Sequence, residues 1–362
     1  MMTAAILALF SGALAWPVPR LLAAAHWPSR CPRSAIVLWQ AVGLAGGVSA
    51  LIAVIAFTFA PLSANVAVSL RDHADHLAAG EPLAGLGWIN LIGLAVASML
   101  TARLFGVLAL STSRTARQRR RHRHLVDLAG RDHDNHDHDN HDQRARRRGQ
   151  VRVLDHPVAV AYCLPGVRHT RVVVSKGLLA ALAPDELEAV LAHEEAHARG
   201  RHDLVIQPFV AWQETFPFLP PAREATAAVS LLVEMLADDA AARCTSGQTL
   251  ARALARLGVA RSPVPAGAVA ITGAPHHRVS ARGRTLWPPR ASHSSDMTES
   301  KGMSRVSASP AEPSRSPIHA PLIARISRLL DPSPRTPLWA HAAVYLTAAA
   351  VSAFPVVVLL AT

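Results

Sequence analysis

The pattern of hydrophobic and polar positions divides the chain into long apolar runs around a polar middle region. Four runs are apolar enough to be membrane spans. They are residues 3–16 (a rather short run, which 21–25 would lengthen), 35–62, 86–110 and 338–360. No positive charge precedes the first run, which favours a retained span over a cleaved signal peptide. The pattern therefore predicts a mostly α, polytopic membrane protein with four transmembrane helices.

Basic residues are concentrated beside these runs and predict their orientation. The formal net charge is +12. Arg20, Arg30 and Arg33 lie between the first two runs, and six arginines follow the third within residues 114–123. The positive-inside rule then places residues 111–337 in the cytoplasm and both termini outside the plasma membrane. Beside a span, such a run favours contact with the lipid bilayer over direct nucleic-acid binding.

Cysteine usage excludes one class of fold and one class of metal site. The three cysteines, Cys31, Cys163 and Cys244, are far apart in the sequence. An odd and sparse set is not typical of a disulfide framework, and it fits a reducing compartment. None has the spacing of a cysteine zinc site.

The candidate chemistry lies in residues 193–197, His-Glu-Glu-Ala-His, which match the H-E-x-x-H pattern. An apolar stripe and Pro184 predict a helix that begins near that proline, and Gly200 predicts its end. Residues four apart share a helix face, so His193 and His197 can bind one zinc ion. Glu194 would then take a proton from water at the metal's open position. Two solvated surface histidines are the alternative.

A second helix, predicted for 222–243, supplies two candidate acids. Glu234 would be the third zinc ligand, because apolar neighbours argue against a fully exposed position. Asp238, one turn further, could hold the free ring nitrogen of a ligand histidine. Either acid could instead be a surface charge. Four side chains are candidate donors to the developing negative charge, and the sequence does not choose among them: Arg199, Arg201, His202 and Arg243.

Short strands are predicted before the motif helix, at 151–154, 158–163 and 171–175. The last could be a sheet edge that holds an extended peptide, or only core sheet. A His/Asp tract at 132–142 and a Ser/Pro-rich segment at 262–316 predict disordered insertions. The expected organisation is three spans in 1–110, a linker in 111–150, a zinc domain in 151–260, a linker in 261–320, and a short helix with the fourth span in 321–362.

The motifs resemble those of BlaR/MecR-type antirepressor metallopeptidases and of the related Ste24/HtpX-type membrane peptidases. The resemblance is carried by 161–166, the strand 172–175, the helix 187–197 and the acidic segment 234–238, with three spans before this region and one after it. It implies a cytoplasmic gluzincin-like α+β domain with one zinc ion held by His193, His197 and Glu234. Glu194 would be the catalytic base.

The resemblance also implies proteolysis of a cytoplasmic protein, in that family a winged-helix repressor of the BlaI/MecI type or the peptidase itself. One departure changes the expected signal. Only a residue or two follow the last span, which leaves no room for the penicillin-binding sensor of the classical members. A quality-control protease of the Ste24/HtpX type is the alternative enzyme. A non-catalytic membrane tether is the alternative from another class.

Overall fold

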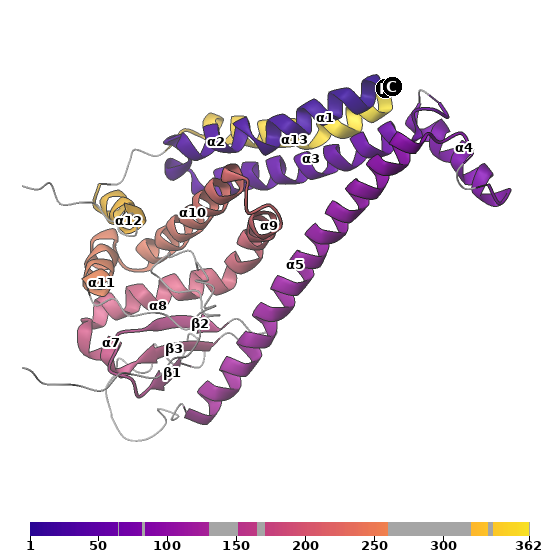
Figure 1. Cartoon of the computed structure of the whole chain (residues 1–362). Helices are drawn as coiled ribbons and strands as arrows, with labels where there is room; N and C mark the ends of the chain where they lie inside the picture. The colour runs from indigo at the N-terminus through magenta and orange to yellow at the C-terminus, as the bar shows by residue number, and fades with distance from the viewer. Residues whose placement is uncertain are drawn as a thin grey trace, which may run out of the picture.

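A computed structural model describes residues 1–63, 65–81, 84–129, 151–164, 171–259, 320–331 and 336–361. The His/Asp tract at 132–142 and the Ser/Pro-rich segment at 262–316 lie outside these residues, so the disorder predicted for them stays a prediction. In the described part, helices predominate and a single small sheet accompanies them (Figure 1).

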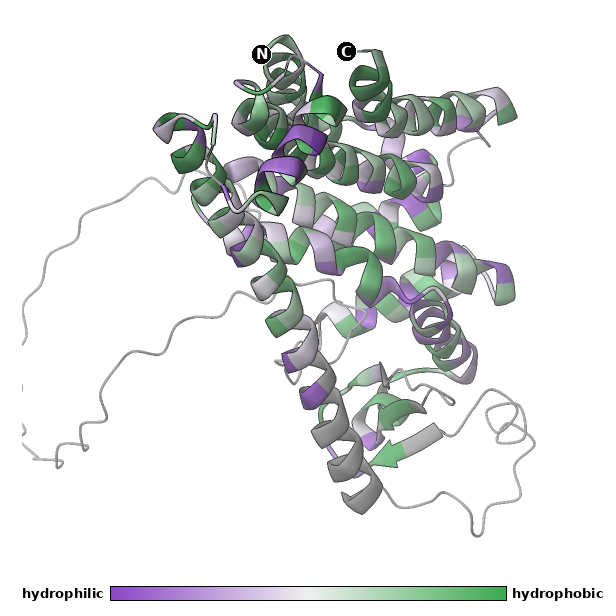
Figure 2. Ribbon diagram, turned by 90° about the vertical axis from the view of Figure 1, so that its right-hand side faces the viewer, coloured by the Kyte–Doolittle hydropathy of each residue, from purple (hydrophilic) through white to green (hydrophobic). Residues whose placement is uncertain are grey.

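Four apolar stretches of helix are long enough to cross a membrane, as the hydrophobic pattern predicts. The first comprises α1 (Met2–Ala15) and α2 (Pro17–Ala24), which are separate helices because Pro17 has no N–H to continue the helical bonds. The others are α3 (Pro32–Phe59), the first part of α5 (Trp88–Ala129) and α13 (Leu338–Ala361). Figure 2 shows the hydrophobic residues along these helices.

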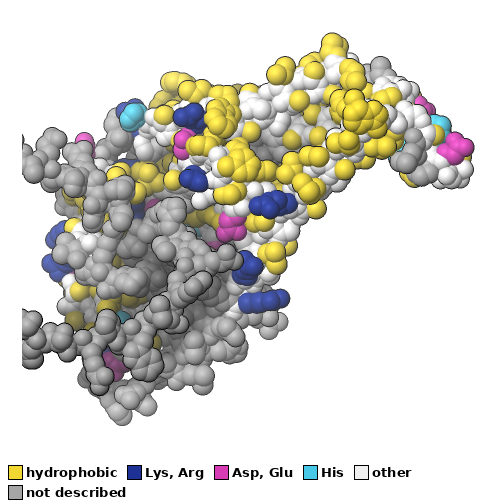
Figure 3. Space-filling view, in the orientation of Figure 1, with side chains coloured by type: hydrophobic (Ala, Val, Ile, Leu, Met, Phe, Trp, Pro, Cys, Tyr) yellow, Lys and Arg dark blue, Asp and Glu magenta, His cyan; other side chains and the backbone are white. Residues whose placement is uncertain are grey.

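Three of these helices pack as a bundle with α3 between its partners. Leu14 of α1, Leu38 and Val42 of α3, and Ala348 of α13 are buried in one cluster. The outward side chains are also apolar, for example Leu44 at 64% exposed. Hydrophobic side chains accordingly cover much of the surface of this region in Figure 3. An apolar surface of this extent is suited to lipid.

Two helical features differ from the prediction. The helix predicted for the third span does not end near 110 but continues as α5 to Ala129, through the basic segment. Arginine is a good helix former, so the polar segment extends the helix instead of ending it. The predicted loop between the second and third spans contains α4 (Val66–Ala78), which begins where Asn65 Oδ1 accepts bonds from the N–H groups of Ala67 and Val68.

The sheet contains β1 (Val151–Leu154), β2 (Ala161–Leu164) and β3 (Arg171–Ser175) in the order β1-β3-β2. β3 pairs in parallel with β1 and antiparallel with β2. The suggestion that 171–175 is a sheet edge is therefore wrong, because both sides of this strand are paired. β2 is an edge strand in the described sheet, and it packs against the motif helix.

Six helices complete the region around the sheet: α7 (Lys176–Ala181), α8 (Pro184–Arg199), α9 (His202–Thr215), α10 (Pro220–Cys244), α11 (Gly247–Val259) and α12 (Ala320–Leu330). α8 lies between the sheet and α10 (Figure 1). α10 in turn packs against α3, where Val229 and Val233 are buried in one cluster with Ile36 and Trp39. The helix that carries Glu234 and Asp238 therefore packs directly on a candidate membrane span.

Candidate metal centre

The motif helix α8 has the bounds that its sequence predicts. Pro184 occupies the first turn, and the Glu186 carboxylate accepts a bond of 3.0 Å from the N–H of Ala183, which closes the start of the helix. The helix ends at Arg199, directly before Gly200, as predicted, but Gly200 itself keeps a right-handed backbone. The left-handed residue is Arg201 (φ 45°), which turns the chain into α9.

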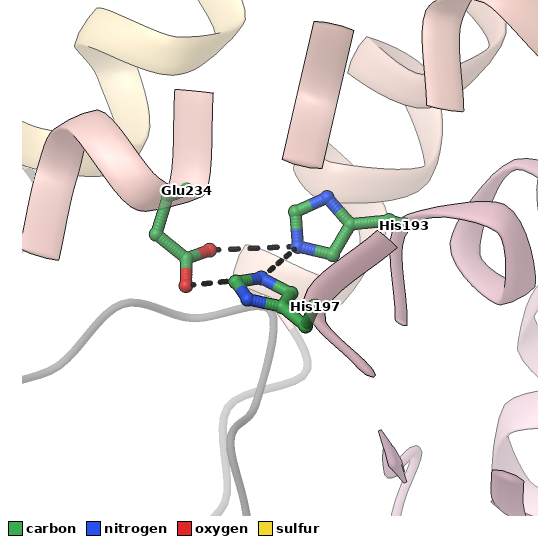
Figure 4. A group of neighbouring side chains, drawn as sticks. All are labelled: His193, His197 and Glu234. Carbon is green, nitrogen blue, oxygen red and sulfur yellow. Dashed lines mark hydrogen bonds and ion pairs between the residues drawn. The ribbon is translucent and has the colours of Figure 1, made fainter. Parts of the chain in front are cut away.

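The structure brings His193, His197 and Glu234 together from α8 and α10 (Figure 4). The Nε2 atoms of the two histidines are 3.0 Å apart. Glu234 Oε2 is 3.5 Å from Nε2 of His193, and Oε1 is 3.4 Å from Nε2 of His197. All three side chains are buried. The alternative of solvated surface groups therefore does not describe these residues.

Each histidine has a partner on its other ring nitrogen. Nδ1 of His193 lies 2.9 Å from Oδ1 of Asp238, the ring nitrogen for which this acid is a predicted partner. Nδ1 of His197 lies 3.0 Å from Nδ1 of His202, the first residue of α9. Such bonds fix the orientation and tautomer of an imidazole, so that Nε2 faces the centre of the group.

A buried arginine that the sequence analysis did not predict joins the group. Arg325 of α12 is 2% exposed and binds Glu234 and Asp238 of α10. A signal for it exists, because Arg325 falls on the same buried helix face as Leu322 and Leu329. An arginine at such a position indicates a buried and paired guanidinium. Its partners lie far back in the sequence and could not be named.

The electrostatics of the group give the two imidazoles different pKa values. Burial alone would lower the pKa of His193, but its bonds to Asp238 and Glu234 raise that pKa to about 9. Burial lowers the pKa of His197 to about 3, so this ring is neutral. Burial opposes the charged forms of Glu234 and Asp238, but Arg325 and the neighbouring histidines hold both carboxyl pKa values below their usual range.

Glu194, the predicted base, is fully buried on the motif helix. Burial would lower the pKa of Arg325, but the charges of Glu234 and Asp238, with a smaller contribution from Glu194, raise that pKa above the usual value. The candidate donors for developing charge are not gathered here. Arg201 and Arg243 are exposed, Arg199 is exposed and pairs with Glu195, and His202 is engaged with His197.

The donor set fits one zinc ion. Two imidazole nitrogens and a carboxylate oxygen are ordinary zinc ligands. Ligand atoms about 2.0–2.1 Å from zinc in a tetrahedral site are about 3.3–3.4 Å apart. The two Nε2 atoms are 3.0 Å apart and Oε1 of Glu234 lies 3.4 Å from Nε2 of His197, both close to this value, and one ligand atom from each of the three residues lies within 4.8 Å of the others. Three protein ligands also leave a fourth position open, as in catalytic zinc sites.

Comparison with known proteins relates part of the chain to a peptidase family. Residues 115–220 match the family model of Peptidase family M48, a range that contains α8 with both histidines and Glu194 but ends before Glu234. No curated protein and no solved structure matches the chain significantly. The match supports the broad class of membrane metallopeptidases.

Proposed function

We propose that the chain is an integral-membrane zinc metalloendopeptidase that hydrolyses peptide bonds of cytoplasmic proteins. The observation that carries the proposal is the convergence of His193, His197 and Glu234 from two helices, with donor atoms at zinc-ligand spacing. The family match to residues 115–220 supports the same chemistry. The cytoplasmic location of this site, with both termini outside, rests on the arginine-rich segments beside the spans.

Each side chain of the site has a separate role in the proposed hydrolysis. Zinc, when bound, would supply a Lewis acid that polarises the scissile carbonyl and lowers the pKa of water. Glu194 accepts the proton of the attacking water and passes it to the leaving amine. Asp238 and His202 hold the rings of His193 and His197 so that their Nε2 atoms face the metal.

The proposed target is a winged-helix repressor of the BlaI/MecI type, so that proteolysis would transmit a signal. The resemblance of the motif helix, the acidic segment and the order of spans to BlaR/MecR-type proteins supports this target. A quality-control protease of the Ste24/HtpX type is the second candidate, because the family match is to a peptidase family and carries no sign of a repressor. Profiling of cleavage products separates one preferred target from many.

Metal analysis and peptide cleavage by the full chain in detergent test the proposed chemistry. We expect one zinc ion per chain in the wild type and in Glu194→Gln, which keeps every ligand but loses the base. Glu234→Ala should lose the metal. A zinc-loaded Glu194→Gln protein that still cleaves peptides would remove the assigned base. A wild type without zinc, with salt-sensitive binding to nucleic acid, would favour the non-catalytic tether.

A further inference from the structure

The guanidinium of Arg325 contacts two carboxylates of α10 at once, which is more than is needed to hold α12 against α10. Nε and Nη2 donate to Oδ2 and Oδ1 of Asp238 at 2.8 and 2.7 Å. Nη1 lies 2.8 Å from Oε2 of Glu234. All three nitrogens of one side chain therefore bind two carboxylates that lie one turn apart on α10. Only arginine presents donors in such a planar fork.

This contact distinguishes the two oxygens of Glu234. Oε2 forms an ion pair with Nη1 of Arg325 at 2.8 Å and lies 3.5 Å from Nε2 of His193, whereas Oε1 lies 3.4 Å from Nε2 of His197. We propose that Arg325 is a positioning residue that reserves Oε1 for the metal and keeps Oε2 away from it. The inference rests on the proposed function, since it concerns how the same site is held. A carboxylate that gave both oxygens to the metal would occupy a position that catalysis needs for water.

The charges of the group support the same role. Glu194, Glu234 and Asp238 are three buried carboxylates, and Arg325 is the buried guanidinium among them. With both imidazoles neutral, as ligation requires, these four side chains carry a net charge of −2, which a divalent cation balances. Without Arg325 their net charge would be −3, which strengthens the attraction for a cation. Loss of Arg325 should therefore not weaken metal binding, although it frees Glu234 to rotate.

The neighbouring Arg328 offers a matched control on the same helix. Its guanidinium binds both oxygens of Asp239 at 2.6 and 2.9 Å and donates to the carbonyl of Ser29 at 2.7 Å. These contacts hold α12 against α10 and the turn before α3, but they do not reach Glu234 or the histidines. A substitution here tests the seating of α12 without touching the site.

The experiment compares wild type with Arg325→Lys, Arg325→Met and Arg328→Met, all as the full chain in detergent. Arg325→Lys keeps the buried charge and removes the fork, so it covers the case in which Arg325→Met does not fold. Four quantities are measured: the Zn²⁺ dissociation constant by chelator competition, the visible spectrum of the Co²⁺-substituted protein, the thermal midpoint without metal, and kcat and KM for a fluorescence-quenched peptide found by cleavage profiling.

For Arg325→Lys we expect a Zn²⁺ dissociation constant no weaker than that of wild type, an altered Co²⁺ spectrum, and kcat reduced about 10- to 100-fold with KM unchanged. Arg328→Met should keep the wild-type spectrum and kcat even if its midpoint falls. Wild-type kcat in Arg325→Lys, loss of metal in parallel with kcat, or the same changes in Arg328→Met would each overturn the inference. A wild type that binds no metal would instead refute the proposed function.

Discussion

The contact between His202 and His197 leads to a prediction that depends on one interatomic distance. Their Nδ1 atoms are 3.0 Å apart, and His202 is buried. Burial lowers the pKa of His202, so the ring is neutral and the pair shares a single hydrogen bond. Gly200 lies so close to this ring that a Cβ at position 200 would collide with Nε2 of His202. His202→Ala removes the bond, and Gly200→Ala displaces the ring.

The expected magnitude follows from the burial of the pair. A buried polar atom that loses its partner costs about 1–3 kcal/mol. Because Nδ1 of His197 is oriented by this bond, the cost should appear as a Zn²⁺ dissociation constant about 10- to 100-fold weaker in His202→Ala. The backbone of Gly200 is right-handed (φ −74°) and accepts alanine. A Cβ at this position would also lie 3.1 Å from the carbonyl oxygen of Ala196, but its collision with the His202 ring is closer, so most of the effect of Gly200→Ala should act through His202.

Chelator competition with Zn²⁺ measures these effects in wild type, both single variants and the double variant. We expect Gly200→Ala to weaken binding in the wild-type background and to have a much smaller effect in the His202→Ala background. Gly43→Ala, at a position where a Cβ meets nothing within 4 Å, is the control for the substitution itself. Equal effects of Gly200→Ala in both backgrounds would refute the coupling through His202.

Three further measurements test the charge of the site and the position of α12. The pKa of His193 is raised to about 9, so below that pH a proton on its ring competes with the metal. Zn²⁺ affinity should therefore rise about tenfold per pH unit between about pH 6.5 and about pH 9. A flat profile of affinity against pH would contradict this. The same proton stabilises the metal-free protein below about pH 6.5, and its contribution is lost as pH rises through about 9, which thermal midpoints can follow. Gly247→Ala should disturb α12 and lower kcat, because its Cβ would lie 2.8 Å from the rigid carbonyl oxygen of Leu329, whereas Gly258→Ala meets only the flexible end of Leu322 and should keep kcat near wild type.

Local patterns predict the parts of this protein that depend on neighbours in sequence. The bounds of α8 follow from Pro184, the apolar stripe and Gly200, and the position of Glu234 within an apolar segment predicts its burial. The apolar runs predict the long helices for the same reason, since length and hydropathy are properties of a single segment. Helical spacing is enough to bring His193 and His197 together.

Contacts between distant segments could not be predicted in this way. The neighbours of β3 depend on strand pairing, which one strand's sequence does not specify, and this is why the edge prediction failed. Arg325 binds Asp238 across 87 positions of sequence. Its burial could be predicted from the apolar face of α12, but the choice between the acids of α10 and any other carboxylate needs the fold.

The packing of α10 on the membrane helices argues that the site cannot be separated from them. Val233, directly before Glu234, and Val229, one turn earlier, are fully buried in a cluster that includes Ile36 and Trp39 of α3. Each such valine contributes about 1.5–3 kcal/mol by burial, a large share of the roughly 5–15 kcal/mol of net stability that a domain has. A fragment comprising residues 151–331 should therefore aggregate or bind Zn²⁺ far more weakly than the full chain, as sedimentation and chelator competition would measure. A soluble, monomeric fragment with the Zn²⁺ affinity of the full chain would show that α3 is not needed to hold Glu234 in place.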